Sequence, residues 1–130
     1  MSVNSEYKHV ELTRKIIGSA MKVHRYFGSG FPEIIYHKSL LIELRKIGVN
    51  AKSEVEEAVI YEEEIVGKRR IDIIVEDKVL VELKALAVLD DECYNQVLNC
   101  LKVFRFEVGL LLNFGKASLE FKRFARYGQY

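Results

Sequence analysis

Apolar residues recur at helical spacing in two stretches near the start of the chain. Between residues 12 and 27 they form one stripe of a helix: Leu12, Ile16, Ala20, Val23 and Phe27. Gly28-Ser29-Gly30 ends this pattern, and Pro32 then stands where the first turn of a second helix accepts proline. We expect that helix to reach about residue 47, with Gly48 as its C-terminal cap and with an inner side formed by Leu40, Leu41, Leu44 and Ile47.

After residue 48 the apolar residues alternate with a period of two, which indicates strands. Short polar turns separate the first three strands, so we expect an antiparallel meander. A third helical pattern and a short apolar run follow, and the last segment fits either an edge strand or a short helix. The expected strands are 55–61, 65–75, 79–85 and 108–112, the helix is 90–104, and the undecided segment is 118–126.

The element order is therefore α-α-β-β-β-α-β plus a tail, an α/β fold with one sheet. A chain of 130 residues, 49% hydrophobic, fits one domain over residues 1–130. No apolar run is long enough to span a membrane, and the first residues lack the apolar core of a signal peptide, so we expect a cytoplasmic protein. Cys93 and Cys100 stand two helical turns apart, too far for a disulfide, and are expected to be buried and reduced.

The formal net charge is only +1, which argues against a generally basic nucleic-acid binder. The charges are nevertheless segregated along the chain. Residues 54–64 contain six glutamates and no basic residue, whereas residues 101–130 contain six basic and two acidic residues. A local basic surface is therefore compatible with the total, and the six glutamates are expected to point away from any nucleic acid.

Three charged residues interrupt the two most apolar strands. Asp72 lies in the run Ile71–Val75, and Glu82 and Lys84 share one face of the next strand. The short turn between these strands puts Asp72 opposite Glu82 or about one pair away. Buried charges need partners, and two interpretations remain open: a cross-strand salt bridge at a sheet edge, or a site where both carboxylates hold Mg²⁺ or Mn²⁺.

The order Asp72, nine residues, then Glu82-Leu83-Lys84 resembles the PD-(D/E)XK nuclease superfamily, although Ile71 replaces the proline of the motif. The stretch Gly30-Phe31-Pro32-Glu33-Ile34-Ile35-Tyr36 is similar to the signature of its GxxExxY branch. The resemblance covers nearly the whole chain, from about residue 12 to residue 126. It implies a restriction-endonuclease-like core in which helices flank one central mixed sheet.

The resemblance also implies roles for individual residues. Asp72, Glu82, the carbonyl of Leu83 and Glu33 would bind Mg²⁺ or Mn²⁺, and Lys84 would position or activate the attacking water. Gln96 would lie close to this site on the following helix, and Tyr36 is either a residue that orients Glu33 or a core tyrosine. The residues expected to contact nucleic acid are Lys68, Arg69, Arg70, Lys102, Arg105 and Lys116.

The expected activity is therefore Mg²⁺-dependent hydrolysis of phosphodiester bonds in DNA, including structured or branched DNA. The chain shows no sequence-reading module such as a helix-turn-helix. Similar small resolvases act as homodimers, and the resemblance implies the same arrangement here. A different interpretation is a catalytically inactive module of this fold that binds nucleic acid or a protein partner.

Overall fold

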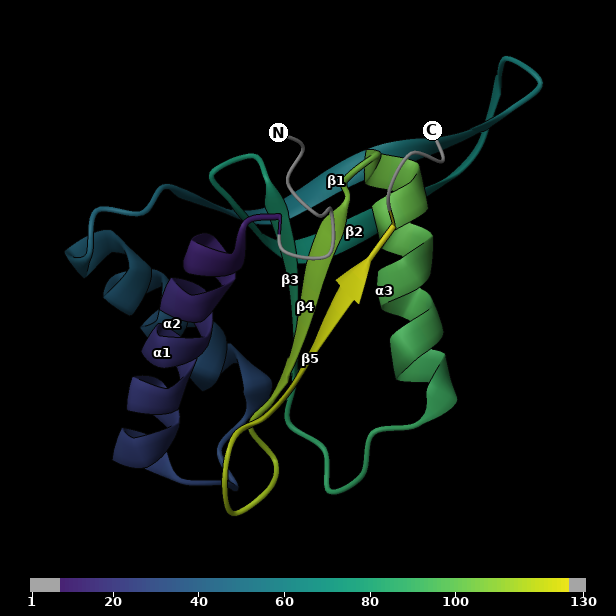
Figure 1. Ribbon diagram of the computed structural model, residues 1–130. Coiled ribbons are helices and arrows are strands. Elements are labelled where there is room, and N and C mark those ends of the chain that lie inside the picture. Colours follow the sequence, from purple (N-terminus) through teal and green to yellow (C-terminus); the bar gives the residue numbers. More distant parts are fainter. Residues whose placement is uncertain (1–7, 127–130) are drawn as a thin grey trace.

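The computed structural model describes residues 8–126, which form three helices and one sheet (Figure 1). The order along the chain is α-α-β-β-β-α-β-β, as the sequence predicted apart from the choice left open for the tail. The bounds are α1 (Val10–Phe27), α2 (Glu33–Lys46), β1 (Ala51–Tyr61), β2 (Glu64–Val75), β3 (Val79–Lys84), α3 (Asp91–Phe104), β4 (Val108–Asn113) and β5 (Glu120–Ala125).

The strands form a mixed sheet in the order β1-β2-β3-β4-β5. Only the β3–β4 pair is parallel, because α3 carries the chain back between these two strands. β3 is central and all of its apolar side chains are buried, as expected for a strand that is apolar on both faces. The tail is an edge strand, antiparallel to β4, and not a helix.

Helices cover both faces of the sheet (Figure 1). α1 and α2 pack on one face, with a core that includes Ile16, Leu40 and Leu83. α3 packs on the other face over a second core, which includes Leu80, Val97 and Leu111. The two cores fix the sheet between its helical layers, since each face buries its own apolar set.

β1 and β2 form a long hairpin that continues past the rest of the sheet (Figure 1). β3 pairs only with the last residues of β2, from Ile73 to Val75. The earlier part of β2 pairs with β1 alone, out to Tyr61 and Glu64 at the turn. This part of the hairpin therefore extends beside the C-terminal half of α3, where it forms one wall of the groove described below.

Two details of α2 differ from the sequence prediction. Pro32 is the N-cap of the helix and not a residue of its first turn, and the helix ends at Lys46. Ile47 was expected to face inward but is the C-cap, with φ −94° and ψ 9°, and its side chain is 48% exposed. The helical spacing fails there because the backbone has already left the helix, and Gly48 follows with a positive φ.

Both cysteines are free and buried, as predicted. No helix within residues 8–126 has the length and apolar character needed to cross a membrane.

Candidate active site at the central hairpin

Asp72 and Glu82 lie side by side on β2 and β3. The last Cα pair in the register between these strands is Ile73 with Val81, so the next residues on each strand are Asp72 and Glu82. The Asp72 carboxylate accepts a hydrogen bond from the backbone N–H of Leu83, with a length of 2.8 Å. The Asp72 carboxylate also acts on the Glu82 carboxyl group, whose neutral form can donate a hydrogen bond to it.

This arrangement raises the pKa of Glu82 to about 9. Burial contributes most, because it disfavours the charged form, and the hydrogen bond and negative charge of Asp72 add to the effect. The charge of Glu33 acts in the same direction, whereas Lys84 opposes it. The pair of acids therefore holds a proton at neutral pH when no cation is bound.

Lys84 does not neutralise this pair through a salt bridge. Among the ion pairs of residues 8–126, none joins Lys84 to Asp72, Glu82 or Glu33. Its ammonium group instead donates a 3.3 Å hydrogen bond to the side-chain oxygen of Gln96 on α3. The cross-strand salt bridge, one of the two interpretations left open by the sequence, is not the arrangement observed.

Glu33 approaches the same acids from α2, where it is the first helical residue. Its pKa is raised, mainly by desolvation and then by the charge of Asp72, while Lys84 counteracts the shift. Glu33 is therefore close enough to interact electrostatically with Asp72, although α2 packs on the face of the sheet opposite to α3.

Tyr36 holds the loop that leads into α2. It is fully buried, and its hydroxyl group donates a 2.5 Å hydrogen bond to the Gly28 carbonyl and accepts a 3.2 Å bond from the Phe31 N–H. Its ring stacks on Phe114 of the core. Tyr36 therefore combines the two sequence interpretations: it is a core tyrosine, and it positions the start of the helix that carries Glu33.

The oxygen donors suit a hard divalent cation better than a transition metal that prefers nitrogen or sulfur. In residues 8–126 no group of three or more histidine, cysteine, aspartate or glutamate side chains forms a metal cage. Mg²⁺ does not need such a cage, because it is usually held by one or two carboxylates together with water and substrate oxygens. Asp72, Glu82 and the Leu83 carbonyl fit that type of site.

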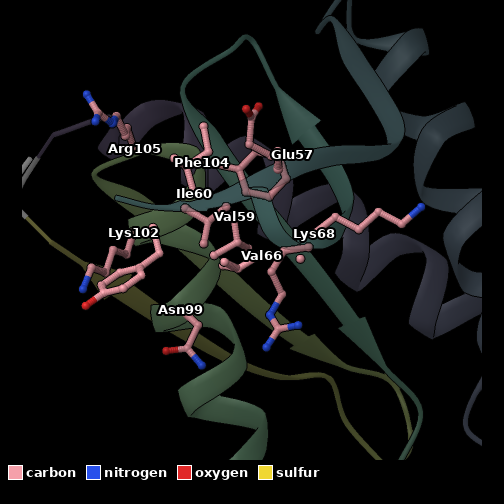
Figure 2. Close-up of a pocket in the computed structure, with 14 residues that line it drawn as sticks. Glu57, Val59, Ile60, Val66, Lys68, Asn99, Lys102, Phe104 and Arg105 are labelled. Carbon is pink, nitrogen blue, oxygen red and sulfur yellow. The ribbon is translucent and has the colours of Figure 1, made fainter. Parts of the chain in front are cut away.

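The predicted nucleic-acid residues fall into two sets. Four of them, Lys68, Arg69, Lys102 and Arg105, line a groove between the β1–β2 hairpin and α3 (Figure 2). Arg70 lies outside the groove, 4.0 Å from Glu54, and Lys116 forms a 3.4 Å ion pair with Glu120 beside β5. Of the six glutamates expected to face away, Glu57 also lines the groove.

Two residues have surroundings that the sequence did not predict. Cys100 was expected to be buried, but not close to the acids: its thiol pKa is raised to about 11, mostly by burial and then by the charge of Glu82. Asn99 lines the groove one helical turn after Gln96. The spacing of three residues from Gln96 to Asn99 was the available signal, since it places both on one side of a helix.

Comparisons with known proteins agree with this architecture. A family model described as the PD-(D/E)XK nuclease superfamily matches residues 10–124. Three chains of solved structures match, and one of them, titled "Crystal structure of SSO0001", is 20% identical with a TM-score of 0.59. That alignment covers 94% of this chain but 58% of the other, and at this identity it supports the fold alone. No curated protein matches the chain in sequence. The fold of residues 8–126 agrees with a restriction-endonuclease-like core.

Proposed function

The chain belongs to the PD-(D/E)XK nuclease superfamily, and from that premise we propose that it hydrolyses phosphodiester bonds of DNA with Mg²⁺ or Mn²⁺. One observation carries the proposal: Asp72 and Glu82 lie side by side and half-buried on β2 and β3, and no salt bridge among residues 8–126 neutralises them. Such a pair is costly to keep in a sheet, and a divalent cation would replace the proton and satisfy both groups.

Asp72, Glu82 and the Leu83 carbonyl would hold the cation, with Glu33 as a further ligand directly or through water. When bound, a divalent cation lowers the pKa of a coordinated water and stabilises negative charge on a phosphoryl group. Positioning of the water and of the metal ligands would depend on other residues of the chain.

Lys84 would orient the attacking water and stabilise charge that develops on the phosphate oxygens. Gln96 would hold the Lys84 ammonium group over the acids, because its side-chain oxygen already accepts a hydrogen bond from it. Tyr36 would act as a positioning residue, since it fixes the loop that precedes Glu33. A tilt of that loop would move Glu33 relative to the hairpin.

We also propose that the chain falls within the GxxExxY branch. Gly30 has a φ of 104°, which favours glycine, and the Tyr36 hydroxyl group is hydrogen-bonded to Gly28 and Phe31, on either side of this region. We propose further that residues 1–130 form a single domain and that the protein acts as a homodimer. Light scattering at several protein concentrations tests the dimer, and limited proteolysis tests the domain.

A cleavage assay tests the activity. Labelled branched, single-stranded and duplex DNA would be incubated with Mg²⁺ or Mn²⁺, and with EDTA as a blank. Asp72→Asn and Lys84→Ala should each reduce the rate by 10²-fold or more, because each removes a group that acts on the reacting phosphate. Asp77→Asn is the matched control, since Asp77 is exposed in the turn after β2.

Equal cleavage by the wild type and both site variants would overturn the assignment of the site. Absence of cleavage, together with absence of Mg²⁺ or Mn²⁺ binding in calorimetry, would instead favour the inactive binding module.

A further inference from the structure

A groove with a volume of about 1020 Å³ runs between the projecting part of the β1–β2 hairpin and the C-terminal half of α3 (Figure 2). One wall consists of hairpin residues on both strands, from Glu57 to Tyr61 and from Val66 to Arg69. The other wall is formed by α3 and the residue after it, from Asn99 to Arg105. Neither wall includes Asp72, Glu82 or Lys84, so this groove is separate from the acid pair.

The groove nevertheless leads away from the candidate active site. On α3, Gln96 contacts Lys84, and Asn99 and Lys102, which line the groove, follow it at intervals of three residues. On β2, Arg69 precedes Asp72 by three residues, about 10 Å along the strand. Both walls therefore belong to elements that also carry residues of the candidate active site.

Positive charge predominates in the groove. Lys68 pairs with Glu56 at 3.1 Å, and Figure 2 shows its amine extending away from Lys102 and Arg105. Within residues 8–126, Arg69, Lys102 and Arg105 form no ion pair, and Glu57 is the acidic residue of the lining. The free charges complement a chain of phosphates.

Between these cations the lining is apolar and aromatic. Ile60, Tyr61 and Val66 are 64%, 66% and 61% exposed, which is unusual for side chains of this kind gathered in one place. Phe104 lies on the opposite wall and is half-buried. Within residues 8–126 neither Tyr61 nor Phe104 stacks on another aromatic ring. Tyr61 is largely exposed, whereas Phe104 packs partly against the core under α3 and presents only its remaining surface to the groove.

We propose that this groove binds an unpaired stretch of a nucleic-acid strand and guides it to the acid pair. The inference rests on the proposed nuclease function and adds the form of its substrate. A duplex presents phosphates outward and encloses its bases, so it would satisfy the cations but leave the apolar lining without a partner. An unpaired strand satisfies both, because its bases stack on aromatic and apolar side chains while its phosphates face Arg69, Lys102 and Arg105.

A binding experiment tests this separately from catalysis. Fluorescence anisotropy with the full chain in EDTA would compare four labelled ligands of equal length: single-stranded DNA, single-stranded RNA, duplex DNA, and an abasic strand that has phosphates but no bases. The variants are Phe104→Leu, which keeps an apolar side chain but removes the ring, and the double change Arg69→Ala with Lys102→Ala. Lys38→Ala is the matched control, because Lys38 is an exposed helical lysine on α2, away from the groove.

We expect single strands to bind more tightly than the duplex or the abasic strand. Phe104→Leu should weaken binding of the natural strands by about fivefold or more and leave the abasic strand unchanged, since stacking on one ring is lost. The double variant should weaken all ligands and lower the slope of log affinity against log salt by about 0.7 for each lost phosphate contact. Lys38→Ala should change neither quantity.

The proposal would be overturned if duplex DNA bound as tightly as the single strand. It would also be overturned if Phe104→Leu bound single strands with unchanged affinity. If DNA is cleaved but the groove variants bind normally, the groove assignment alone is wrong. If the groove binds single strands as expected but no cleavage occurs, the nuclease activity alone is wrong. The RNA arm decides which sugar the groove prefers, and preference for either single strand over the duplex supports the proposal.

Discussion

The substitution Glu82→Gln should stabilise the protein in the absence of divalent cations. The Glu82 carboxyl group has a folded-state pKa of about 9 against an ordinary value of 4.5, because it is buried next to Asp72. A carboxyl group whose pKa is raised on folding contributes fully to stability while it is protonated in both the folded and the unfolded state. The contribution is lost once the unfolded chain can release the proton and the folded chain cannot. That contribution is complete below pH 4.5 and is lost as the pH rises toward 9.

The structure sets the magnitude of this loss. At pH 7 the unfolded carboxyl group is ionised, whereas the folded one keeps its proton. Each pH unit above 4.5 costs about 1.4 kcal/mol, so the folded state loses about 3 kcal/mol by pH 7. Glutamine has nearly the same shape, does not ionise, and can donate a hydrogen bond to Asp72 in place of the proton. We therefore expect the variant to recover most of that free energy.

Urea unfolding in EDTA at pH 5, 7 and 8 would measure the effect. The free energy of unfolding of Glu82→Gln should be close to that of the wild type at pH 5 and about 3 kcal/mol higher at pH 7, with a larger gap at pH 8. Glu63→Gln is the control, because Glu63 is exposed in the hairpin turn. Its difference from the wild type should be small at all three values of pH.

Adding Mn²⁺ should reverse the order. The cation binds the ionised pair, so it should stabilise the wild type and leave Glu82→Gln nearly unchanged, and its affinity for the wild type should increase with pH up to about 9. The reasoning is falsified if Glu82→Gln is less stable than the wild type at pH 7 in EDTA, or if the difference between them is the same at pH 5 and pH 8.

Three further predictions concern single residues. Lys84→Ala should leave Mn²⁺ binding in calorimetry intact while the rate of DNA cleavage falls by 10²- to 10⁴-fold. Gln96→Ala should lower the cleavage rate less, because Gln96 acts through Lys84. Loss of metal binding in Lys84→Ala would contradict this division of roles. Tyr36→Phe should lower the free energy of unfolding by about 1–3 kcal/mol, since two buried hydrogen bonds to the loop before α2 are lost, and an unchanged urea midpoint would count against it. Asp90→Ala should cost about 0.5–2 kcal/mol in the same measurement because the Asp90 side chain caps α3, whereas Asp91→Ala, which leaves this cap in place, should cost less.

The sequence was sufficient to predict the hairpin that carries the acids. The turn between β2 and β3 is short, and its register pairs Val75 with Val79. Because strand side chains alternate strictly, this register puts Asp72 level with Glu82 and leaves Lys84 on the same face as Glu82. The helices were predictable for a similar reason, since helical spacing and the flanking glycine, proline and aspartate residues mark their limits.

Distances between elements were not predictable. The sequence left a salt bridge open for Lys84, but α3 packs so that Gln96 takes its ammonium group. Glu33 comes close enough to the hairpin to feel the charge of Asp72 because the loop held by Tyr36 brings α2 to that end of the sheet. The tail could not be assigned from its weak alternation, and it became a strand because β4 offered an unpaired edge.

By itself the sequence therefore determined which residues share a face and which element carries each of them, because periodicity is a local property of the backbone. Only the tertiary structure decided that burial beside Asp72 raises the pKa of Glu82, that Lys84 turns to Gln96, and that the basic residues separate into those of the groove and those outside it. These three features depend on how far the β1–β2 hairpin extends beside α3 and on how the helices pack on the sheet. The spacing of residues along one element determines neither the length of that extension nor the packing.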